Sequence, residues 1–80
     1  MTLYQFKLLD EMEQIEKIWE SPLIAKRSDE EFDYELYQIR KFYAELRYLK
    51  GEKAINNLKT FENPDLLQPY FSQIDISKLK

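Results

Sequence analysis

The side chains of this chain that could do chemistry are carboxylates, tyrosines, lysines and arginines. Its 80 residues include no histidine and no cysteine, which removes most nucleophile–base pairs, thiolate catalysis and transition-metal sites. A single glycine also excludes a glycine-rich phosphate loop. Two acidic clusters remain, one at Asp10, Glu11 and Glu13 and the other in the stretch "DEEFD" at 29–33.

Two neighbouring carboxylates can act as an acid and a base when burial separates their pKa values. Both clusters, however, lie where helix starts and turns commonly place acids. The second cluster also lacks the central glycine and the spacing of a calcium loop. We therefore expect solvated caps and turns, with no enzymatic activity, no metal and no cofactor.

The middle of the chain interleaves aromatic and basic residues. The candidate partner-binding residues are Tyr37, Arg40, Tyr43, Arg47, Tyr48 and Lys50. Tyrosine and arginine are favoured anchors of protein interfaces, and aromatic rings beside cations also suit single-stranded nucleic acid. Because the whole chain has a net charge of −3, whereas nucleic-acid modules are usually basic, a protein partner or a second copy of the chain is the favoured interpretation.

Charge is unevenly distributed along the chain. Residues 1–33 hold nine acids and four bases, whereas residues 34–60 hold six bases and three acids. This asymmetry predicts either complementary faces within the fold or a dipolar surface for a partner. Ordinary solvated faces are the simpler interpretation.

An amphipathic helix is predicted over residues 8–20. Asp10 can cap it with Glu13 three residues later, and Pro22 disfavours the helical conformation at Ser21. We expect Trp19 to be a core residue of this helix, with an interface anchor as the alternative. The apolar residues recur at helical spacing: Leu8, Met12, Ile15, Ile18 and Trp19.

A second helix is predicted near residues 64–73. Asn63 would cap it and Pro64 would take the first helical position. Pro69 falls late enough to shorten or kink this helix. Its apolar face would hold Leu66, Leu67, Tyr70, Phe71 and Ile74.

Residues 32–49, "FDYELYQIRKFYAELRYL", fit two secondary structures. Phe32, Leu36, Ile39, Tyr43 and Leu46 recur at helical spacing, and Gly51 could end such a helix. Apolar and polar residues also alternate over 42–49, as in a strand, and "KGEK" at 50–53 would then be a hairpin loop. Against two strands, the loop at Arg40 and Lys41 lacks the Gly, Asn or Asp of a tight turn.

A resemblance favours the sheet. The segments "YQFKLLDEMEQIEKIW" at 4–19, "LYQIRKFYAELRYLKGEKAINNLKTF" at 36–61 and "LLQPYF" at 66–71 together resemble small uncharacterised bacterial proteins of similar length. The resemblance implies that the middle segment forms strands, and it implies no particular activity. Ala44, Leu46 and Lys50 depart from the β-branched residues expected in those strands.

We therefore predict a single α+β domain over residues 1–80. An N-terminal helix would precede a four-stranded antiparallel β-meander, with strands near 22–27, 34–40, 42–50 and 54–61, and a C-terminal helix would follow. The alternative is an all-α fold of three to four helices. Both helices would cover one face of the sheet, and the other face would present aromatic and charged residues. The helices would bury Met12, Ile15, Trp19, Leu66 and Phe71 against Phe42, Leu46 and Leu36, or against the neighbours of these three that point to the opposite face.

The expected function follows from the absence of a catalytic constellation and from the aromatic middle segment. Apolar runs of at most three residues predict no membrane span, and the N-terminus lacks the pattern of a signal peptide, so we expect a cytoplasmic protein. We expect a non-enzymatic binding or accessory protein that acts through protein–protein contacts or self-association, with edge strands as one route to a dimer. The alternative is a weak single-stranded nucleic-acid binder through an aromatic and basic sheet face.

Overall fold

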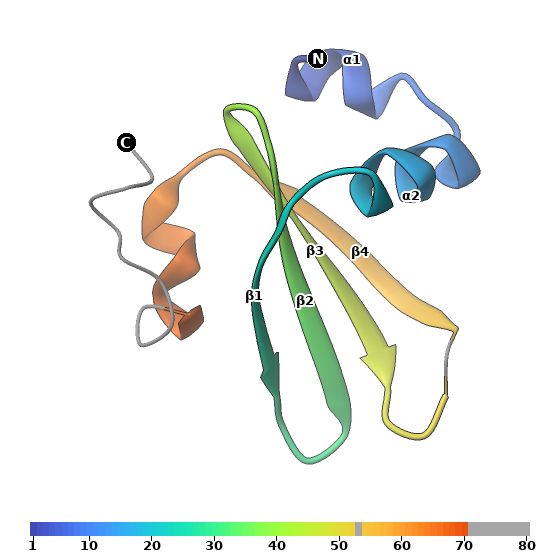
Figure 1. Cartoon of the computed structure of the whole chain (residues 1–80), viewed down its shortest axis with the longest axis vertical. Helices are drawn as coiled ribbons and strands as arrows, with labels where there is room; N and C mark the ends of the chain where they lie inside the picture. The colour runs from blue at the N-terminus through green and yellow to red at the C-terminus, as the bar shows by residue number, and fades with distance from the viewer. Residues whose placement is uncertain (53, 71–80) are drawn as a thin grey trace.

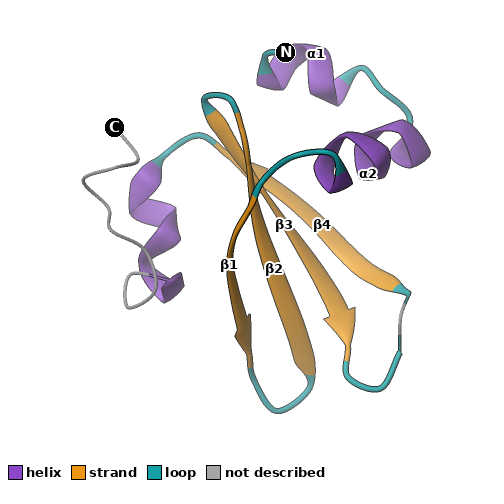
Figure 2. Cartoon of the chain, viewed as in Figure 1, coloured by secondary structure: helices purple, strands orange, loops and turns teal. Residues whose placement is uncertain are grey.

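The computed structural model describes residues 1–52 and 54–70 of the chain. Four antiparallel strands form one sheet in the order β1-β2-β3-β4, preceded by two short α-helices and followed by a 3-10 helix (Figures 1 and 2). The elements are α1 Leu3–Lys7, α2 Glu11–Trp19, β1 Leu23–Ser28, β2 Phe32–Ile39, β3 Phe42–Leu49, β4 Ile55–Phe61 and the 3-10 helix η1 Pro64–Tyr70. The predicted helix-and-meander arrangement is confirmed, and the all-α alternative is wrong. In the part of the chain described, no helix is long and apolar enough to cross a membrane.

The ambiguous middle segment forms β2 and β3. These strands pair without interruption from Ile39 opposite Phe42 to Phe32 opposite Leu49. Arg40 takes a φ of 55° in the two-residue loop between them. Two-residue hairpin loops need a positive φ at their first central residue, so the pairing of two eight-residue strands overrides the poor turn preference of arginine. At the other end of β3, Gly51 has a φ of 82°, and the predicted hairpin loop is confirmed.

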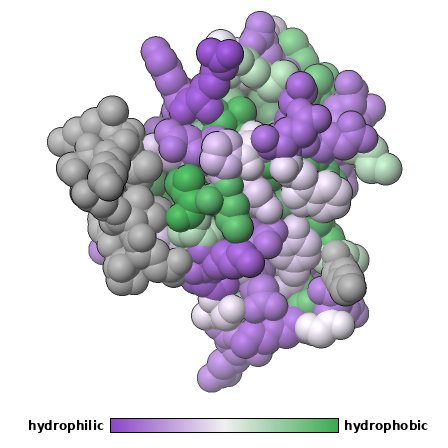
Figure 3. Space-filling model, in the orientation of Figure 1, coloured by the Kyte–Doolittle hydropathy of each residue, from purple (hydrophilic) through white to green (hydrophobic). Residues whose placement is uncertain are grey.

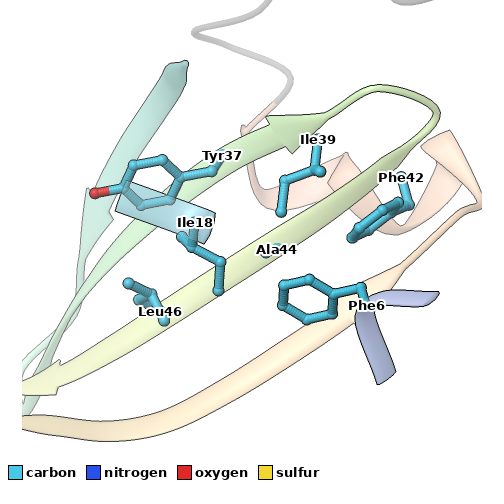
Figure 4. Packing of buried hydrophobic residues seen from close by; sticks show 7 residues of the cluster. All are labelled: Phe6, Ile18, Tyr37, Ile39, Phe42, Ala44 and Leu46. Carbon is cyan, nitrogen blue, oxygen red and sulfur yellow. The ribbon is translucent and has the colours of Figure 1, made fainter. Parts of the chain in front are cut away.

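Both faces of this sheet carry apolar side chains. On the face of α1 and α2 (the helix-side face), Phe6 packs against Phe42 with ring centroids 5.3 Å apart, and Ile18 lies over Ala44 and Leu46 (Figure 4). On the face of η1 (the η1-side face), a second cluster forms because alternate residues of a strand point in opposite directions. Its members are Ala25, Tyr34, Leu36, Tyr43, Phe61, Leu67 and Tyr70.

The predicted single N-terminal helix is divided into two. Asp10 is an N-cap as predicted and accepts a hydrogen bond from the Glu13 amide at 2.8 Å. Thr2 is a second N-cap, which forms a capping box with Gln5. Two N-caps eight residues apart each begin a helix, so the chain changes direction between α1 and α2.

This division also changes which side chains are buried. Met12 and Trp19, predicted to be core residues, are 70% and 58% exposed, and Leu8 is equally exposed. Met12 and Trp19 lie seven residues apart and so share one side of α2, at about 100° from Ile18. Ile18 is the residue of α2 that enters the core. Predicted burial of Met12 and Trp19 is therefore wrong.

The C-terminal element also differs from the prediction. Asn63 caps it as expected, accepting from the Asp65 amide at 2.9 Å, but the segment is a 3-10 helix rather than an α-helix. Pro69 has no N–H and cannot donate the i to i−4 bond of an α-helix. Because η1 packs on the face opposite α1 and α2, the prediction that both helices cover one face is wrong. Residues 71–74, including Phe71 and Ile74, and the side chain of Leu66 lie outside what the structure describes.

A hydrogen bond from η1 to the sheet fixes η1 in place. The Tyr70 hydroxyl donates to Glu45 Oε2 at 2.5 Å, and Arg27 Nη2 lies 3.6 Å from the same oxygen. The Arg27 guanidinium carbon also lies 3.7 Å from the centroid of the Tyr34 ring. A cation, a carboxylate and two tyrosines thus lie together on the η1-side face.

Replacing Arg40 with glycine should stabilise the fold. A left-handed conformation costs an L-residue about 1–2 kcal/mol, and the greater unfolded-state entropy of glycine offsets about 0.5–1 kcal/mol of the gain. We expect Arg40→Gly to raise the free energy of unfolding by about 0.5–1 kcal/mol, measured by urea denaturation. Lys41→Gly, at the neighbouring position without a positive φ, should lower it. A higher free energy of unfolding for both glycine variants, or for neither, would contradict this account.

Removing the Tyr70 hydroxyl should destabilise the attachment of η1. Tyr70→Phe leaves the mostly buried Glu45 carboxylate without its short hydrogen bond, which should lower the free energy of unfolding by about 1–3 kcal/mol. Tyr43→Phe is the matched control, because Tyr43 is buried on the same face and stacks on Phe61. Equal losses for the two variants would show that the bond to Glu45 contributes nothing specific.

Candidate functional site

The six predicted partner-binding residues do not share one surface. Tyr37 and Tyr48 lie on the helix-side face, Tyr43 and Arg47 lie on the η1-side face, and Arg40 and Lys50 lie in loops at opposite ends of β3. The predicted exposed face of aromatic and basic residues is therefore wrong. Its residues were selected by proximity in the sequence, whereas each step along a strand reverses the direction of the side chain.

Tyr43 and Arg47 already have partners within the fold. Tyr43 is 3% exposed and stacks on Phe61 at 5.9 Å between ring centroids. Arg47 donates from Nε to Asn56 Oδ1 at 2.9 Å and lies 4.4 Å from the centre of the Phe32 ring. The nucleic-acid interpretation used these two residues together with Tyr37 and Lys50, which lie on another face and in a loop, so the geometry gives it no stacking face.

The two acidic clusters have local structural roles. Asp10 caps α2, and Asp29 accepts from the amides of Glu31 and Phe32 and from the hydroxyl of Tyr34, at 2.7–2.9 Å. The Tyr34 hydroxyl is the main reason that the pKa of Asp29 is lowered, and the two amides add to it. Within residues 1–52 and 54–70, no group of three or more acids comes together as a metal site.

A hollow of about 580 Å³ lies on the helix-side face, at the C-terminal end of α2. We call it the aromatic hollow. It has the volume of a site for a large side chain or a small ligand. The lining residues that concern its chemistry are Trp19, Lys26, Asp33, Glu35, Tyr37, Tyr48 and Glu52.

Strand register brings these residues together. Lys26 of β1 lies opposite Glu35 of β2, and Asp33 of β2 lies opposite Tyr48 of β3. Tyr37 is two residues beyond Glu35 and points to the same face. Its hydroxyl is directed away from Ile39 and Phe42, at the edge of the core (Figure 4). The core of the helix-side face thus ends where the aromatic hollow begins.

Glu35 is the hydrogen-bond acceptor for the tyrosines of the hollow. The Tyr37 hydroxyl donates to Glu35 Oε1 at 3.0 Å. Burial, and then this hydrogen bond, raises the pKa of Tyr37. Burial also raises the pKa of Tyr48; a hydrogen bond from the Trp19 indole opposes the rise, and one to Glu35 adds to it. At neutral pH both tyrosines are therefore protonated donors, and they orient the Glu35 carboxylate.

Acids outnumber bases around the hollow. The residues that line it include three carboxylates, Asp33, Glu35 and Glu52, and two cations, Lys26 and Arg27. The Arg27 guanidinium lies over the Tyr34 ring on the η1-side face. Trp19, the only tryptophan of the chain, stands at the hollow with more than half of its surface in contact with water. This combination of an exposed indole, two more deeply buried tyrosines and net negative charge suits a binding surface rather than a core.

The comparisons give no family assignment. No family model, no curated protein and no solved structure matches this chain. The resemblance to small bacterial proteins therefore stays a prediction.

Sequence reasoning identified Tyr37 and Tyr48 of this site and missed the acids. Glu35 is two residues from Tyr37, and this spacing on a strand is the signal that could have placed it in the hollow. Lys26 and Glu52 carry no such local signal, because cross-strand pairing and a hairpin loop bring them to the site. Trp19 was assigned to the core by a helical spacing that began too early, at Leu8.

Asp29→Asn should weaken the pH dependence of stability. The folded-state pKa of Asp29 lies below its ordinary value of 3.8, so its charge stabilises the fold above that pH and the stabilisation is lost as the pH falls through the lower folded value. The variant should be less stable than the parent at pH 7 and should lose less stability on acidification to about pH 2. Thermal melting across this range measures both effects. Glu30→Gln, an exposed neighbour in the same loop, should change neither, and parallel curves for parent and Asp29→Asn would contradict the assignment.

Proposed function

We propose that this chain is a non-enzymatic binding or accessory protein that acts through contact with another protein, and that the aromatic hollow is its contact surface. The observation that carries this proposal is the position of Trp19, which is 58% exposed beside Tyr37 and Tyr48 in a hollow. Tryptophan and tyrosine are the residues most enriched among those that dominate binding energy.

Leaving Trp19 in water has an energetic consequence. Burying a large apolar side chain contributes about 1.5–3 kcal/mol, which matters in a domain whose total stability is about 5–15 kcal/mol. The fold forgoes most of this contribution at Trp19, whose indole N–H is close enough to the Tyr48 hydroxyl to lower the pKa of that tyrosine. An exposed side chain held in a fixed position loses little entropy when a partner covers it.

The acids of the chain support binding rather than catalysis. Asp10 and Asp29 satisfy backbone amides, Glu45 bonds to Tyr70, and Glu35 accepts from Tyr37. These contacts give the four carboxylates structural partners, whereas acid–base catalysis by a carboxyl group at neutral pH needs one with a strongly raised pKa.

A heterologous partner fits the surface better than a symmetric dimer. On the face that Figure 3 shows, apolar side chains lie in separate areas between hydrophilic ones, whereas obligate dimer interfaces are large and apolar. Self-association through β1 or β4, which occupy the two sheet edges, stays a prediction, and so does the cytoplasmic location.

Trp19→Ala should abolish capture of the partner. The tagged protein and its variant would be compared by quantitative mass spectrometry after affinity purification from a lysate of the source organism. We expect a partner that parent protein enriches and Trp19→Ala loses, because truncating a central aromatic anchor commonly costs about 2 kcal/mol or more of binding energy.

Tyr4→Ala is the matched control, since Tyr4 is an exposed aromatic residue of α1 that does not line the hollow. It should retain the partner. Circular dichroism would establish that both variants are folded. A partner lost equally from both variants, or capture of nothing together with a strictly monomeric sedimentation profile, would refute the proposal.

A further inference from the structure

We infer that the aromatic hollow binds a positively charged side chain, the ammonium or guanidinium group of a lysine or arginine in an exposed segment of the protein partner. This inference rests on the proposed function and specifies the chemistry of the partner. It follows from the charge of the hollow, from its aromatic rings, and from an occupied site of the same chemistry on the opposite face.

The charge of the hollow favours a cation. Asp33, Glu35 and Glu52 line it together with Lys26 and Arg27, so three negative and two positive groups leave a net negative lining. Asp33 also accepts from the Ser28 hydroxyl at 2.7 Å and is held at the surface. A negatively charged segment would be repelled by this charge. An apolar segment would remove water from the acids without replacing its hydrogen bonds.

The aromatic residues add a second source of attraction. Cations are attracted to the faces of tryptophan, tyrosine and phenylalanine rings, most strongly to tryptophan. Trp19, Tyr37 and Tyr48 come from three different elements, α2, β2 and β3, and so bound the hollow from different directions. Rings around a carboxylate are the arrangement that recognises an organic ammonium group, because the rings also cover its aliphatic carbons.

Glu35 is prepared to accept from such a cation. Its carboxylate has about four acceptor positions, and the hydroxyls of Tyr37 and Tyr48 are its donors within the hollow. These donors orient the carboxylate and leave acceptor capacity for an incoming N–H group. Charge-assisted hydrogen bonds of this kind are about twice as strong as neutral ones.

The η1-side face shows the same chemistry already occupied. There the Arg27 guanidinium lies 3.7 Å from the Tyr34 ring and 3.6 Å from Glu45, whose carboxylate accepts from Tyr70. A carboxylate oriented by a tyrosine hydroxyl, beside aromatic rings, thus holds a cation in this same fold. On the helix-side face Glu35 and Tyr37 form the equivalent carboxylate and hydroxyl, next to the opening of the hollow.

A segment of a different protein fits better than a second copy of the chain. One exposed basic pair among the described residues, Arg40 and Lys41, lies in the β2–β3 loop, at the end of the sheet remote from Asp33 and Tyr48. A second copy that used this pair would bind head to tail, and such contacts continue into open chains unless the rotation closes. We therefore commit to a basic segment of a protein partner.

The experiment uses Trp19 fluorescence as the reporter and two matched peptides as probes. Both are blocked at the ends and contain glycines and three identical residues, which are lysine in one peptide and the uncharged isostere norleucine in the other. The lysine peptide should change the emission of Trp19 saturably, with an affinity that falls as salt increases. The norleucine peptide should leave the emission unchanged.

Charge-neutralising variants locate the binding. Glu35→Gln and the loop variant Glu52→Gln should each weaken the lysine peptide by about five- to tenfold, and Lys26→Gln should strengthen it. Glu62→Gln is the matched control, because it removes the same charge at the β2–β3 end of the molecule, and it should change affinity less than about twofold. Glu52→Gln keeps the test valid if Glu35→Gln fails to fold.

Several results would overturn the inference. One is binding of the norleucine peptide as tight as that of the lysine peptide. Another is an equal loss of affinity for Glu35→Gln, Glu52→Gln and Glu62→Gln. Two more are tighter binding of free spermidine than of the lysine peptide, and self-association of the chain that Glu35→Gln removes. The last two would assign the hollow to a polyamine or to a second copy. A lysine peptide that fails to bind, while Trp19→Ala still loses its captured partner, would reject the cation and leave the proposed function standing. If the lysine peptide binds and Trp19→Ala still captures the partner, the cation site would stand and the proposed function would be rejected.

Discussion

The fold depends on the pairing of β2 with β3, two strands that are buried on both faces. Leu36 and Leu46 are each 0% exposed, yet they belong to clusters on opposite faces of the sheet. An antiparallel sheet often leaves one face to water, but this hairpin needs a cover on each side. The chain supplies them from its two ends: α1 and α2 cover the helix-side face, and η1 covers the other. A long hydrogen-bonded hairpin also explains why arginine is accepted at a positive φ.

The aromatic hollow exists because the helices that cover the helix-side face are shorter than the strands beneath them. The nine residues of α2 span about 14 Å, whereas the eight residues of β3 span about 26 Å. Phe6 and Ile18 reach Phe42, Ala44 and Leu46 (Figure 4), but the sheet continues beyond them. Tyrosine suits that position, because its ring can extend the core while its hydroxyl meets water or a carboxylate. Tyr37 and Tyr48 occupy this boundary and Trp19 stands beside it.

Local signals in the sequence were sufficient for the strands and for several chain reversals. The alternation over 42–49, the glycine in the β3–β4 loop and the caps at Asp10 and Asn63 all have their causes within a few residues. The face that each element covers, and the residues that meet in the hollow, depend on long-range pairing. Lys26 reaches Glu35 through the β1–β2 register. Tyr43 and Tyr48 look alike in sequence, yet the first is in the core and the second at the hollow, because they are five positions apart on one strand and so point to opposite faces.

The two faces show how one fold handles half-buried carboxylates in two ways. Moving a carboxylate away from water is unfavourable unless hydrogen bonds and opposite charge compensate for the lost hydration. For Glu45 the compensation is complete within the chain, through Tyr70 and Arg27, and this interaction attaches η1. For Glu35 the tyrosines supply hydrogen bonds, and Asp33 and Glu52 add negative charge that Lys26 and Arg27 do not fully balance. A cation that entered from outside would neutralise this excess, and so the residue types that stabilise one face of the sheet make the other a selective surface for a basic partner.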